Sequence, residues 1–270
     1  MPDLSGYFLI TDLDGTLLTD DKRVLKEDKE AIDRFRECGG QFTIATGRTL
    51  QAAERFLTQL EIDIPAVMYN GSLIYDIKEK KPLYTFELEK GAKEIAVTIL
   101  NKFENTGCEV LRLDNIYVVC NNEYERRHVE LCQVKPAYVD INDMEEIGWH
   151  KVLFADSPER ITEIADFVKD KELPVDFVRS DRCYFEILPK GSSKGTALKE
   201  YIKLMHLESK KVIAAGDYNN DIEMLSAADI GAAPMNAQPE VKKAADIVLE
   251  RSSNEGAVSE LIEKIFTGKL

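Results

Sequence analysis

Basic residues, histidines and long apolar runs are all scarce in this sequence of 270 residues. Lys and Arg number 35 against 49 Asp and Glu, which gives a formal net charge of −14. Because nucleic acids are held mainly by Lys and Arg, a nucleic-acid partner is not expected. No apolar run approaches the ~20 residues that a membrane-spanning helix needs, and the N-terminus lacks the charged-then-apolar order of a secretory signal peptide. We therefore expect no membrane association and a cytoplasmic location.

Metal-binding and disulfide patterns are also missing. The five cysteines are odd in number and include no C-x-x-C pair, so neither a disulfide framework nor a structural zinc site is expected. The three histidines have no ligand spacing, and we expect them in surface or packing positions. The charged run at 125–127 predicts an exposed helix face. The cysteines are Cys38, Cys108, Cys120, Cys132 and Cys183.

Strand-like and helix-like segments alternate at both ends of the chain. Near the N-terminus, short apolar runs are separated by the helical segments 25–38 and 49–60, and the same order returns after residue 211. Such alternation predicts right-handed βαβ units and a parallel sheet. The expected fold class is therefore α/β, with a Rossmann-like parallel-sheet core.

The middle of the chain has a different pattern, in which β-like runs follow one another. Tight polar turns at 114–115 and 180–181 favour antiparallel pairing of the runs that flank them. We therefore expect an inserted α+β domain at 84–187 and a core domain made of 1–83 and 188–270.

The stretch ITDLDGTLL places two carboxylates, Asp12 and Asp14, at the end of an apolar run. Residues two apart in an extended strand point the same way, so these side chains can share one face. Open α/β sheets bind ligands at the carboxyl ends of their strands, and two close carboxylates repel each other unless a cation compensates. The pair therefore indicates a Mg²⁺ site, although Asp14-Gly15 alone is equally typical of a turn.

The stretch ATGR closes the next strand-like run and precedes a helical one. Thr46 offers a hydroxyl group, and the N–H groups that follow it lie at a helix N-terminus, which is a natural anion site. A simple helix cap is the alternative for Thr46, and the two roles are compatible.

Two segments late in the chain carry further polar groups. LPKGSSKGTAL places Lys194 at a helix start, where a positive charge is unfavourable. A facing anion would explain this lysine, and a solvated surface position is the alternative. AAGDYNND ends a strand-like run with Asp217 and adds Asn220 and Asp221, where a helix cap accounts for some of the polar residues but not for all.

These motifs follow strand-like runs in the order D-x-D-G-T, T-G-R, lysine, G-D-x-x-x-D. On them the chain resembles the haloacid dehalogenase-like hydrolase superfamily, and within it the Cof-type phosphatases of subclass IIB, which carry a large α+β cap between the second and third motifs. The resemblance covers the whole chain, and the segment YNGSLIYD also looks like that subgroup. It implies a phosphoric monoester hydrolase in which the insertion is a cap domain that acts as a lid.

The resemblance also implies a role for each motif residue. Asp12 would attack phosphorus and carry a transient aspartyl-phosphate, while Asp14 would protonate the leaving alcohol and then activate water. The implied cofactor is Mg²⁺, which would neutralise the phosphoryl group together with Lys194. The implied catalytic residues are Asp12, Asp14, Thr46 and Lys194. The implied metal ligands are Asp12, Asp14, Asp217 and Asp221. The implied substrate-binding residues are Thr46, Gly47, Arg48, Lys194 and Asn220.

The expected partner is a small phosphorylated metabolite, such as a sugar phosphate or a cofactor phosphate, and the chain is expected to be a monomer or a small homo-oligomer. A phosphotransferase or phosphomutase on the same scaffold is an alternative, as is a non-catalytic phospho-receiver or binding module. The Asp14 acid and the long insertion argue against the receiver. A dinucleotide-binding role is disfavoured because no G-x-G-x-x-G follows the first strand.

Overall fold

The computed structural model describes residues 2–113 and 115–270. The chain divides into two compact units. The first consists of the residues up to Gly47, Arg55–Leu83 and Ser193–Leu270, and the second consists of Arg48–Glu54 and Tyr84–Ser192. The prediction that residues 84–187 form an inserted domain remains a prediction.

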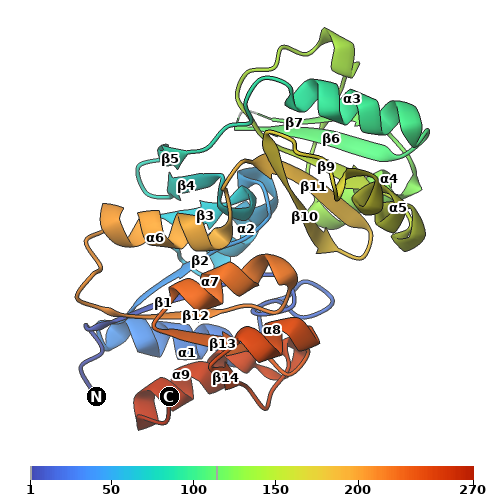
Figure 1. Ribbon diagram of the computed structural model, residues 1–270. Coiled ribbons are helices and arrows are strands. Elements are labelled where there is room, and N and C mark those ends of the chain that lie inside the picture. The colour runs from blue at the N-terminus through green and yellow to red at the C-terminus, as the bar shows by residue number, and fades with distance from the viewer. Residues whose placement is uncertain (1, 114) are drawn as a thin grey trace. The chain divides into compact units, whose positions relative to one another are not determined.

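Parallel strands form the centre of the first unit, in the order β14-β13-β12-β1-β2 (Figure 1). β1 pairs in parallel with β12 on one side and with β2 on the other, so the two ends of the chain share one sheet. Short, buried, apolar strands of this kind are typical of parallel sheets, and the expected α/β class with a parallel-sheet core is confirmed. The strands are β1 (Tyr7–Thr11), β2 (Gln41–Ile44), β12 (Lys211–Ala215), β13 (Ile230–Ala233) and β14 (Ile247–Val248).

Helices alternate along the chain with the strands of this sheet. In α1 the apolar stripe of Ala31, Ile32 and Phe35 is buried, while acidic residues in the first turn and arginines in the last turn suit the helix dipole. The helices are α1 (Lys26–Glu37), α2 (Leu50–Gln59), α6 (Lys194–Leu204), α7 (Ile222–Ala227), α8 (Pro239–Ala244) and α9 (Ala257–Thr267).

The apolar run PAVMYNG (65–71), which predicts a third strand, forms only a short one. β3 (Ala66–Met68) gives way to a 3-10 turn, η1 (Tyr69–Gly71), in which all three residues have positive φ. β3 pairs with the hairpin of β4 (Leu73–Asp76) and β5 (Lys81–Thr85) in the order β3-β4-β5. A parallel bridge between Ala45 and Val67 also links β3 to the end of β2.

The second unit is built on a mainly antiparallel sheet in the order β10-β11-β9-β6-β7-β8. Alternate residues of β6, β9 and β11 point to one face, where they form an apolar core with helices α3 and α5. The other face carries Glu109, Lys151 and Glu186, and α4 contacts β6 and β9. The elements are α3 (Ala92–Lys102), β6 (Gly107–Arg112), β7 (Ile116–Cys120), α4 (Glu123–Cys132), β8 (Ala137–Tyr138), β9 (Trp149–Ala155), α5 (Pro158–Val168), β10 (Val175–Asp181) and β11 (Tyr184–Pro189).

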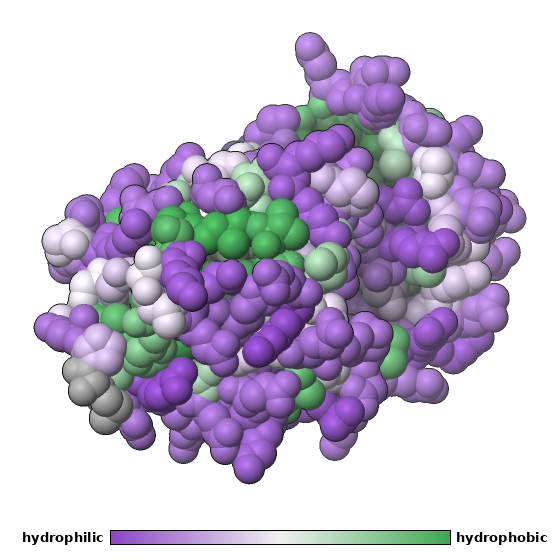
Figure 2. Space-filling view, turned by 90° about the horizontal axis from the view of Figure 1, so that it is seen from below, coloured by the Kyte–Doolittle hydropathy of each residue, from purple (hydrophilic) through white to green (hydrophobic). Residues whose placement is uncertain are grey.

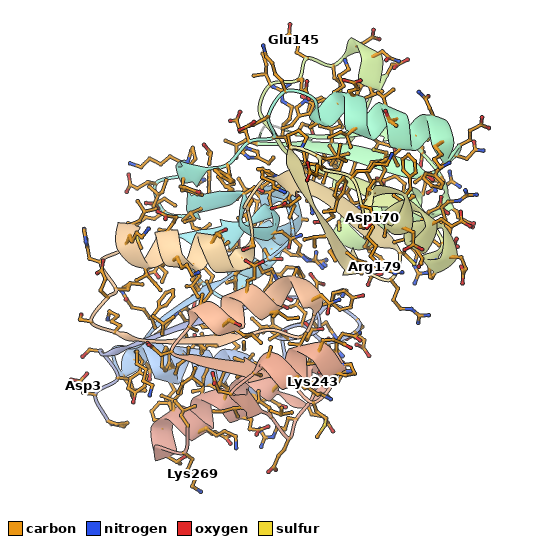
Figure 3. The ribbon with its side chains drawn as sticks, viewed as in Figure 1. Asp3, Glu145, Asp170, Arg179, Lys243 and Lys269 are labelled. Atoms are coloured by element: carbon orange, nitrogen blue, oxygen red, sulfur yellow. The ribbon has the colours of Figure 1, made fainter. Side chains whose placement is uncertain are left out.

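Two details of this sheet differ from the sequence-based expectation. β10 continues to Asp181 through an irregularity in its pairing, so the turn lies at Arg182–Cys183 rather than at 180–181. Arg179, labelled in Figure 3, stabilises this turn by donating a hydrogen bond from Nη2 to the carbonyl oxygen of Arg182 (2.8 Å). The short strand β8 was not predicted. The turn expected at 114–115 contains Asp114, which lies outside the described residues.

Hydrophilic residues cover most of the face of the molecule shown in Figure 2, as a chain with 31% charged residues requires. Within the described ranges, no helix is both long enough and apolar enough to cross a membrane.

Candidate functional site

Two adjacent strand ends bring the first and last motifs together. β1 and β12 pair in register with Thr11 opposite Ala215, so Asp12 and Gly216 both lie just past the carboxyl edge of the sheet. The Asp12 N–H donates to the carbonyl oxygen of Ala215 (2.8 Å), which fixes the backbone at this point. Asp12 is only 5% exposed, so its carboxylate is a buried charge that needs a partner.

Lys194 supplies that partner. Its Nζ lies 2.6 Å from Oδ1 of Asp12 and 2.6 Å from Oδ1 of Asp221, and its side chain is 1% exposed. α6 begins at Lys194 and is fixed there by a capping box of Ser193 and Thr196. The alternative of a solvated surface lysine is therefore wrong, because two carboxylates compensate the charge at this helix start.

Asp12, Asp217 and Asp221, which we call the aspartate cluster, each offer a carboxylate oxygen, and these oxygens all lie within 4.8 Å of one another. Oδ1 of Asp217 accepts a hydrogen bond from the Thr16 hydroxyl (2.9 Å). Oδ2 of Asp221 accepts from the backbone N–H groups of Asp217 and Tyr218 (3.0 Å each). The structure thus brings together side chains from three separate segments and holds them with defined hydrogen bonds.

Two glycines permit this close approach. A Cβ atom on Gly15, whose φ is +80°, would lie 2.3 Å from Oδ2 of Asp217. A Cβ atom on Gly216 would lie 2.3 Å from Cβ of Asp221. Both contacts are far shorter than van der Waals distance, so the glycines of the D-G-T and G-D motifs are required by the packing of the aspartates.

The electrostatics of the cluster favour an added positive charge. Burial raises the pKa of Asp12 to about 7, although Lys194 acts in the opposite direction. Burial, together with the carboxylates of Asp12 and Asp221, also raises the pKa of Asp217 well above its usual range. Burial lowers the pKa of Lys194, but Asp12 and Asp221 outweigh this effect, and the net pKa is raised. One ammonium group thus faces three carboxylates in a buried site.

These residues fit a hard divalent cation. Every donor in the aspartate cluster is a carboxylate oxygen, which is the ligand type that Mg²⁺ prefers. Such an ion would also balance the excess negative charge. The cluster includes three of the four predicted metal ligands, Asp12, Asp217 and Asp221.

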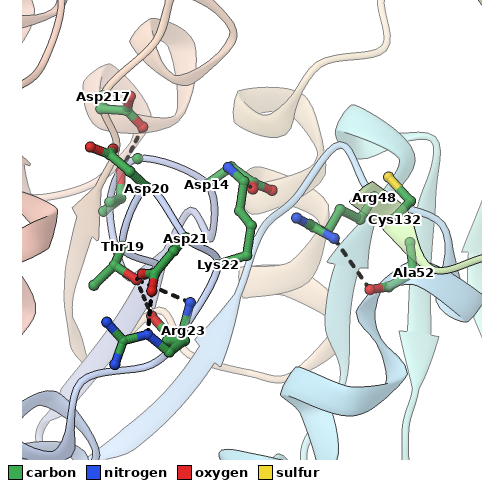
Figure 4. A network of polar contacts seen from close by, with 12 residues as sticks. Asp14, Thr19, Asp20, Asp21, Lys22, Arg23, Arg48, Ala52, Cys132 and Asp217 are labelled. Atoms are coloured by element: carbon green, nitrogen blue, oxygen red, sulfur yellow. Dashed lines mark hydrogen bonds and ion pairs between the residues drawn. The ribbon is translucent and has the colours of Figure 1, made fainter. Parts of the chain in front are cut away.

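The fourth, Asp14, is placed differently. Its carboxylate is 36% exposed and lies 2.8 Å from Nζ of Lys22 (Figure 4). It is near enough to Asp12 to contribute to the raised pKa of that residue. Its partial exposure gives this carboxylate access to solvent, and its catalytic role stays a prediction.

Thr46 and Gly47 contact Asn70, which belongs to the segment YNGSLIYD but was not among the predicted site residues. The N–H of Thr46 donates to the carbonyl of Val67 (2.9 Å), and its own carbonyl accepts from the N–H of Asn70 (3.1 Å). A Cβ atom on Gly47 would lie 2.8 Å from Oδ1 of Asn70. Asn70 is buried with φ of +56°, in the left-handed region that asparagine adopts more readily than most other non-glycine residues.

Asn220 joins this group, whereas Arg48 belongs to the second unit. Nδ2 of Asn220 donates to Oδ1 of Asn70 (2.9 Å), which ties the turn after β12 to the turn after β3. Nη1 of Arg48 donates to the carbonyl of Ala52 (3.4 Å; Figure 4). The substrate-binding roles of Arg48, Gly47 and Asn220 stay predictions.

A second group of titratable side chains was missed altogether. Glu109, Glu125 and His128, in the second unit, also place ligand atoms within 4.8 Å of one another. Glu125 is fully buried, so the prediction of an exposed helix face at 125–127 is wrong for this residue. No sequence motif links these positions, because they meet only through the packing of α4 on β6.

Comparisons with known proteins agree on one family. The family model described as haloacid dehalogenase-like hydrolase matches residues 9–262 of this chain. The chain is 29% identical to pyridoxal phosphate phosphatase YbhA of Escherichia coli, over 88% of this chain and 91% of that protein. It is 26% identical to 5-amino-6-(5-phospho-D-ribitylamino)uracil phosphatase YitU of Bacillus subtilis, over 97% of this chain and 98% of that protein.

A solved structure gives the same result for the fold. The protein BT4131, described as a subclass IIB sugar phosphatase of the same superfamily, matches with a TM-score of 0.84 at 22% identity. The match covers 97% of this chain and 99% of that one. It therefore includes both the parallel sheet of the first unit and the antiparallel sheet of the second.

Proposed function

Because this chain belongs to the haloacid dehalogenase-like hydrolase family, as its motifs predicted, and is a phosphoric monoester hydrolase, we propose that it hydrolyses small phosphorylated metabolites with Mg²⁺ and an aspartyl-phosphate intermediate on Asp12. The observation that carries this proposal is the pair of 2.6 Å contacts from Lys194 to Asp12 and Asp221, with Asp217 in the same cluster. A buried nucleophilic carboxylate, a fixed cation and an oxygen-only metal site are what phosphoryl transfer requires.

The reaction has two halves. In the first, a carboxylate oxygen of Asp12 forms a bond to phosphorus while the bond from phosphorus to the substrate oxygen breaks. Asp14 gives its proton to the leaving alkoxide, so an alcohol departs. In the second, Asp14 takes a proton from water as the water oxygen attacks phosphorus, and the bond to Asp12 breaks to release inorganic phosphate.

The surrounding residues neutralise and hold the phosphoryl group. Lys194 keeps one oxygen of Asp12 in place and supplies a fixed positive charge. Asp12 and Asp217, with Asp221 and the Asp14 backbone carbonyl, would hold Mg²⁺, which supplies charge neutralisation. Thr46 and the N–H groups that follow it would bind phosphoryl oxygens, with Gly47, Arg48 and Asn220 as further substrate-binding residues.

The substrate class rests on the relatives. One relative is named for pyridoxal phosphate and another for a phosphorylated ribitylamino-uracil, and the structural neighbour is described as a sugar phosphatase. We therefore propose a phosphorylated sugar or cofactor of similar size. Hydrolysis is favoured over transfer to a second alcohol by the same names, and Asp14 disfavours a stable phospho-receiver.

A panel of phosphorylated metabolites, assayed for phosphate release with and without Mg²⁺, tests this proposal. We expect release that depends on Mg²⁺, with one phosphate for each alcohol formed and no phosphorylated acceptor when other alcohols are added. Asp12→Asn should reduce turnover on the order of 10⁴-fold or more, as loss of a nucleophile does elsewhere. Turnover at the normal rate by a correctly folded Asp12→Asn variant would refute the assignment.

A further inference from the structure

The second unit contains a buried group of potential metal ligands between a strand and a helix. Val110 and Cys108 of β6 pack into the apolar core, so Glu109, which alternates with them, points to the opposite face of the sheet. Glu125 and His128 are three residues apart on α4, and therefore share one side of that helix. We call Glu109, Glu125 and His128 the glutamate–histidine cluster.

The geometry is compact and nearly closed to solvent. One ligand atom from each residue lies within 4.8 Å of the other two, and Nδ1 of His128 is 3.5 Å from Oε1 of Glu109. The side chain of Glu109 is 0% exposed and that of His128 is 17% exposed. Glu125 is likewise 0% exposed. The imidazole thus lies at the side of the cluster through which an ion from solvent would enter.

The carboxylates lack the partners that buried charges normally have. Neither oxygen of Glu109 and neither oxygen of Glu125 has a hydrogen-bond partner among the residues described by the structure. The nearby cation Lys151 pairs with Glu186 (2.9 Å) and also attracts the carboxylate of Glu109. Two buried carboxylates without hydrogen bonds cost several kcal/mol each unless a positive charge compensates them. The ion pair with His128 supplies one positive charge for the two carboxylates, and Lys151 adds a weaker attraction.

The orientation of His128 also fits a metal ligand. Its Nε2 lies 3.4 Å from Sγ of Cys132, and its ring packs edge-on against Tyr184, with 4.8 Å between ring centroids. If Nε2 carries the proton and donates it to Cys132, the lone pair of Nδ1 faces the two carboxylates. Metal-ligating histidines are typically oriented in this way, by a hydrogen bond from the nitrogen that does not bind the metal.

We propose that Glu109, Glu125 and His128 bind a divalent first-row transition-metal ion, with Cys132 orienting the histidine. Two carboxylates and one imidazole match the ligands used for Zn²⁺ and its neighbours rather than for Mg²⁺, which prefers oxygen alone. The site is distinct from the aspartate cluster in both position along the chain and donor chemistry. It is independent of the proposed phosphatase mechanism.

Calorimetric titration of the full-length, chelator-treated protein with Zn²⁺ tests the proposal, with Mg²⁺ in excess to occupy the aspartate cluster. We expect one Zn²⁺ to bind per chain at the glutamate–histidine cluster while Mg²⁺ is present. Glu125→Gln and His128→Gln should each weaken this event by more than about 100-fold, and Cys132→Ser by about 10–100-fold. Glu130→Gln, which changes an exposed carboxylate on the same helix, is the matched control and should leave it unchanged.

Two results would overturn the proposal. One is Zn²⁺ binding of equal affinity and stoichiometry in the wild type and in Glu125→Gln. The other is loss of the event in Asp217→Asn instead, which would assign the Zn²⁺ to the aspartate cluster. Thermal unfolding of each metal-free variant serves as the folding control. Glu125→Gln should fold in any case, because it removes a buried charge and keeps the shape of the side chain.

Discussion

The aspartate cluster and the glutamate–histidine cluster each bury negative charge, but they compensate it in opposite ways. In the aspartate cluster Lys194, Thr16 and two backbone N–H groups all donate to the carboxylates. In the glutamate–histidine cluster none of the four carboxylate oxygens has a hydrogen-bond partner within the described residues. The first group is therefore held in place by the protein itself, whereas the second depends on a bound proton or cation.

The difference has consequences for stability and for function. A carboxylate with protein partners keeps its position with or without a bound cation, so we expect the aspartate cluster to have the same geometry in both states. A buried carboxylate without hydrogen-bond partners is stabilised mainly by a bound metal ion. We therefore expect metal binding at the glutamate–histidine cluster to raise the stability of the second unit.

The largest effect should follow from Lys194→Met. This change leaves Asp12 and Asp221 buried without their shared cation, and breaking a buried pair in this way costs about 3 to 5 kcal/mol. Loss of a positive charge at the phosphoryl group should also lower kcat by about 10³- to 10⁵-fold. Urea unfolding in the presence of chelator and steady-state phosphate release measure the two effects.

Lys203→Met provides the matched control on the same helix. Lys203 pairs with Glu200 at 2.7 Å, but the two side chains are 66% and 36% exposed. Exposed pairs contribute at most about 1 kcal/mol, so this variant should retain both stability and activity. Equal behaviour of the two lysine variants would mean that burial of Lys194 has no role in the site.

The aspartate cluster could be predicted from the sequence because its residues follow strand ends. Asp12 comes directly after β1, and Asp217 comes two residues after β12. Once these runs are identified as neighbouring parallel strands, their carboxyl ends must meet at one edge of the sheet. Lys194 was harder to assign, because a lysine in a glycine- and serine-rich segment is more often solvated, and only its place among the other motifs identified it.

The glutamate–histidine cluster could not be predicted by the same reasoning. Glu109 alternates with buried apolar residues on β6, as an exposed residue would, and Glu125 lies in a strongly charged helix. Their burial depends on how α4 packs against the sheet, which is tertiary information. Asn70 was not predicted as a site residue for a related reason, since the left-handed turn at Tyr69–Gly71 follows an apolar run that resembles a continuing strand.

Asp14 lies outside the aspartate cluster, and its carboxylate is partly exposed and paired with Lys22. Asp14→Asn should lower kcat by about 10²- to 10⁴-fold for alkyl phosphates, whose leaving group needs a proton. The loss should be much smaller for an aryl phosphate with an acidic phenol. Asp21→Asn, in the same loop, is the control and should leave turnover unchanged. An equal loss on both substrates would argue against the acid role.

Asp28 is a buried carboxylate in which one oxygen accepts a hydrogen bond and the other does not. In its number of hydrogen-bond partners it is thus intermediate between the carboxylates of the two clusters. Its Oδ1 accepts from the N–H of Ser259 (2.7 Å), while Oδ2 has no partner among the described residues. Burial raises its pKa from 3.8 to about 7. Because the folded state keeps this proton to a higher pH than the unfolded state, the stability of the wild type falls as pH rises from about 4 to 7.

Asp28→Asn removes this titration and keeps the acceptor for Ser259. At about 1.4 kcal/mol per pKa unit, the variant should gain at most about 4 kcal/mol over the wild type above pH 7, and little near pH 4. Chemical denaturation at several pH values measures the difference. Glu37→Gln, which alters an exposed carboxylate at the end of the same helix, is the reference. A difference that does not change with pH would show that folding does not raise the pKa of Asp28.

The smallest effect should come from the neutral hydrogen bond beside the aspartate cluster. Asn220→Ala removes the donor to Oδ1 of Asn70 (2.9 Å), and a neutral hydrogen bond contributes about 1 kcal/mol. Because this bond links the turn that follows β12 to the turn that follows β3, we expect KM to rise a few-fold with kcat little changed. Asn219→Ala, at the exposed neighbouring position, is the control. A loss of kcat comparable to that of Lys194→Met would mean that Asn220 acts on the reacting group itself and does not merely position the binding turn.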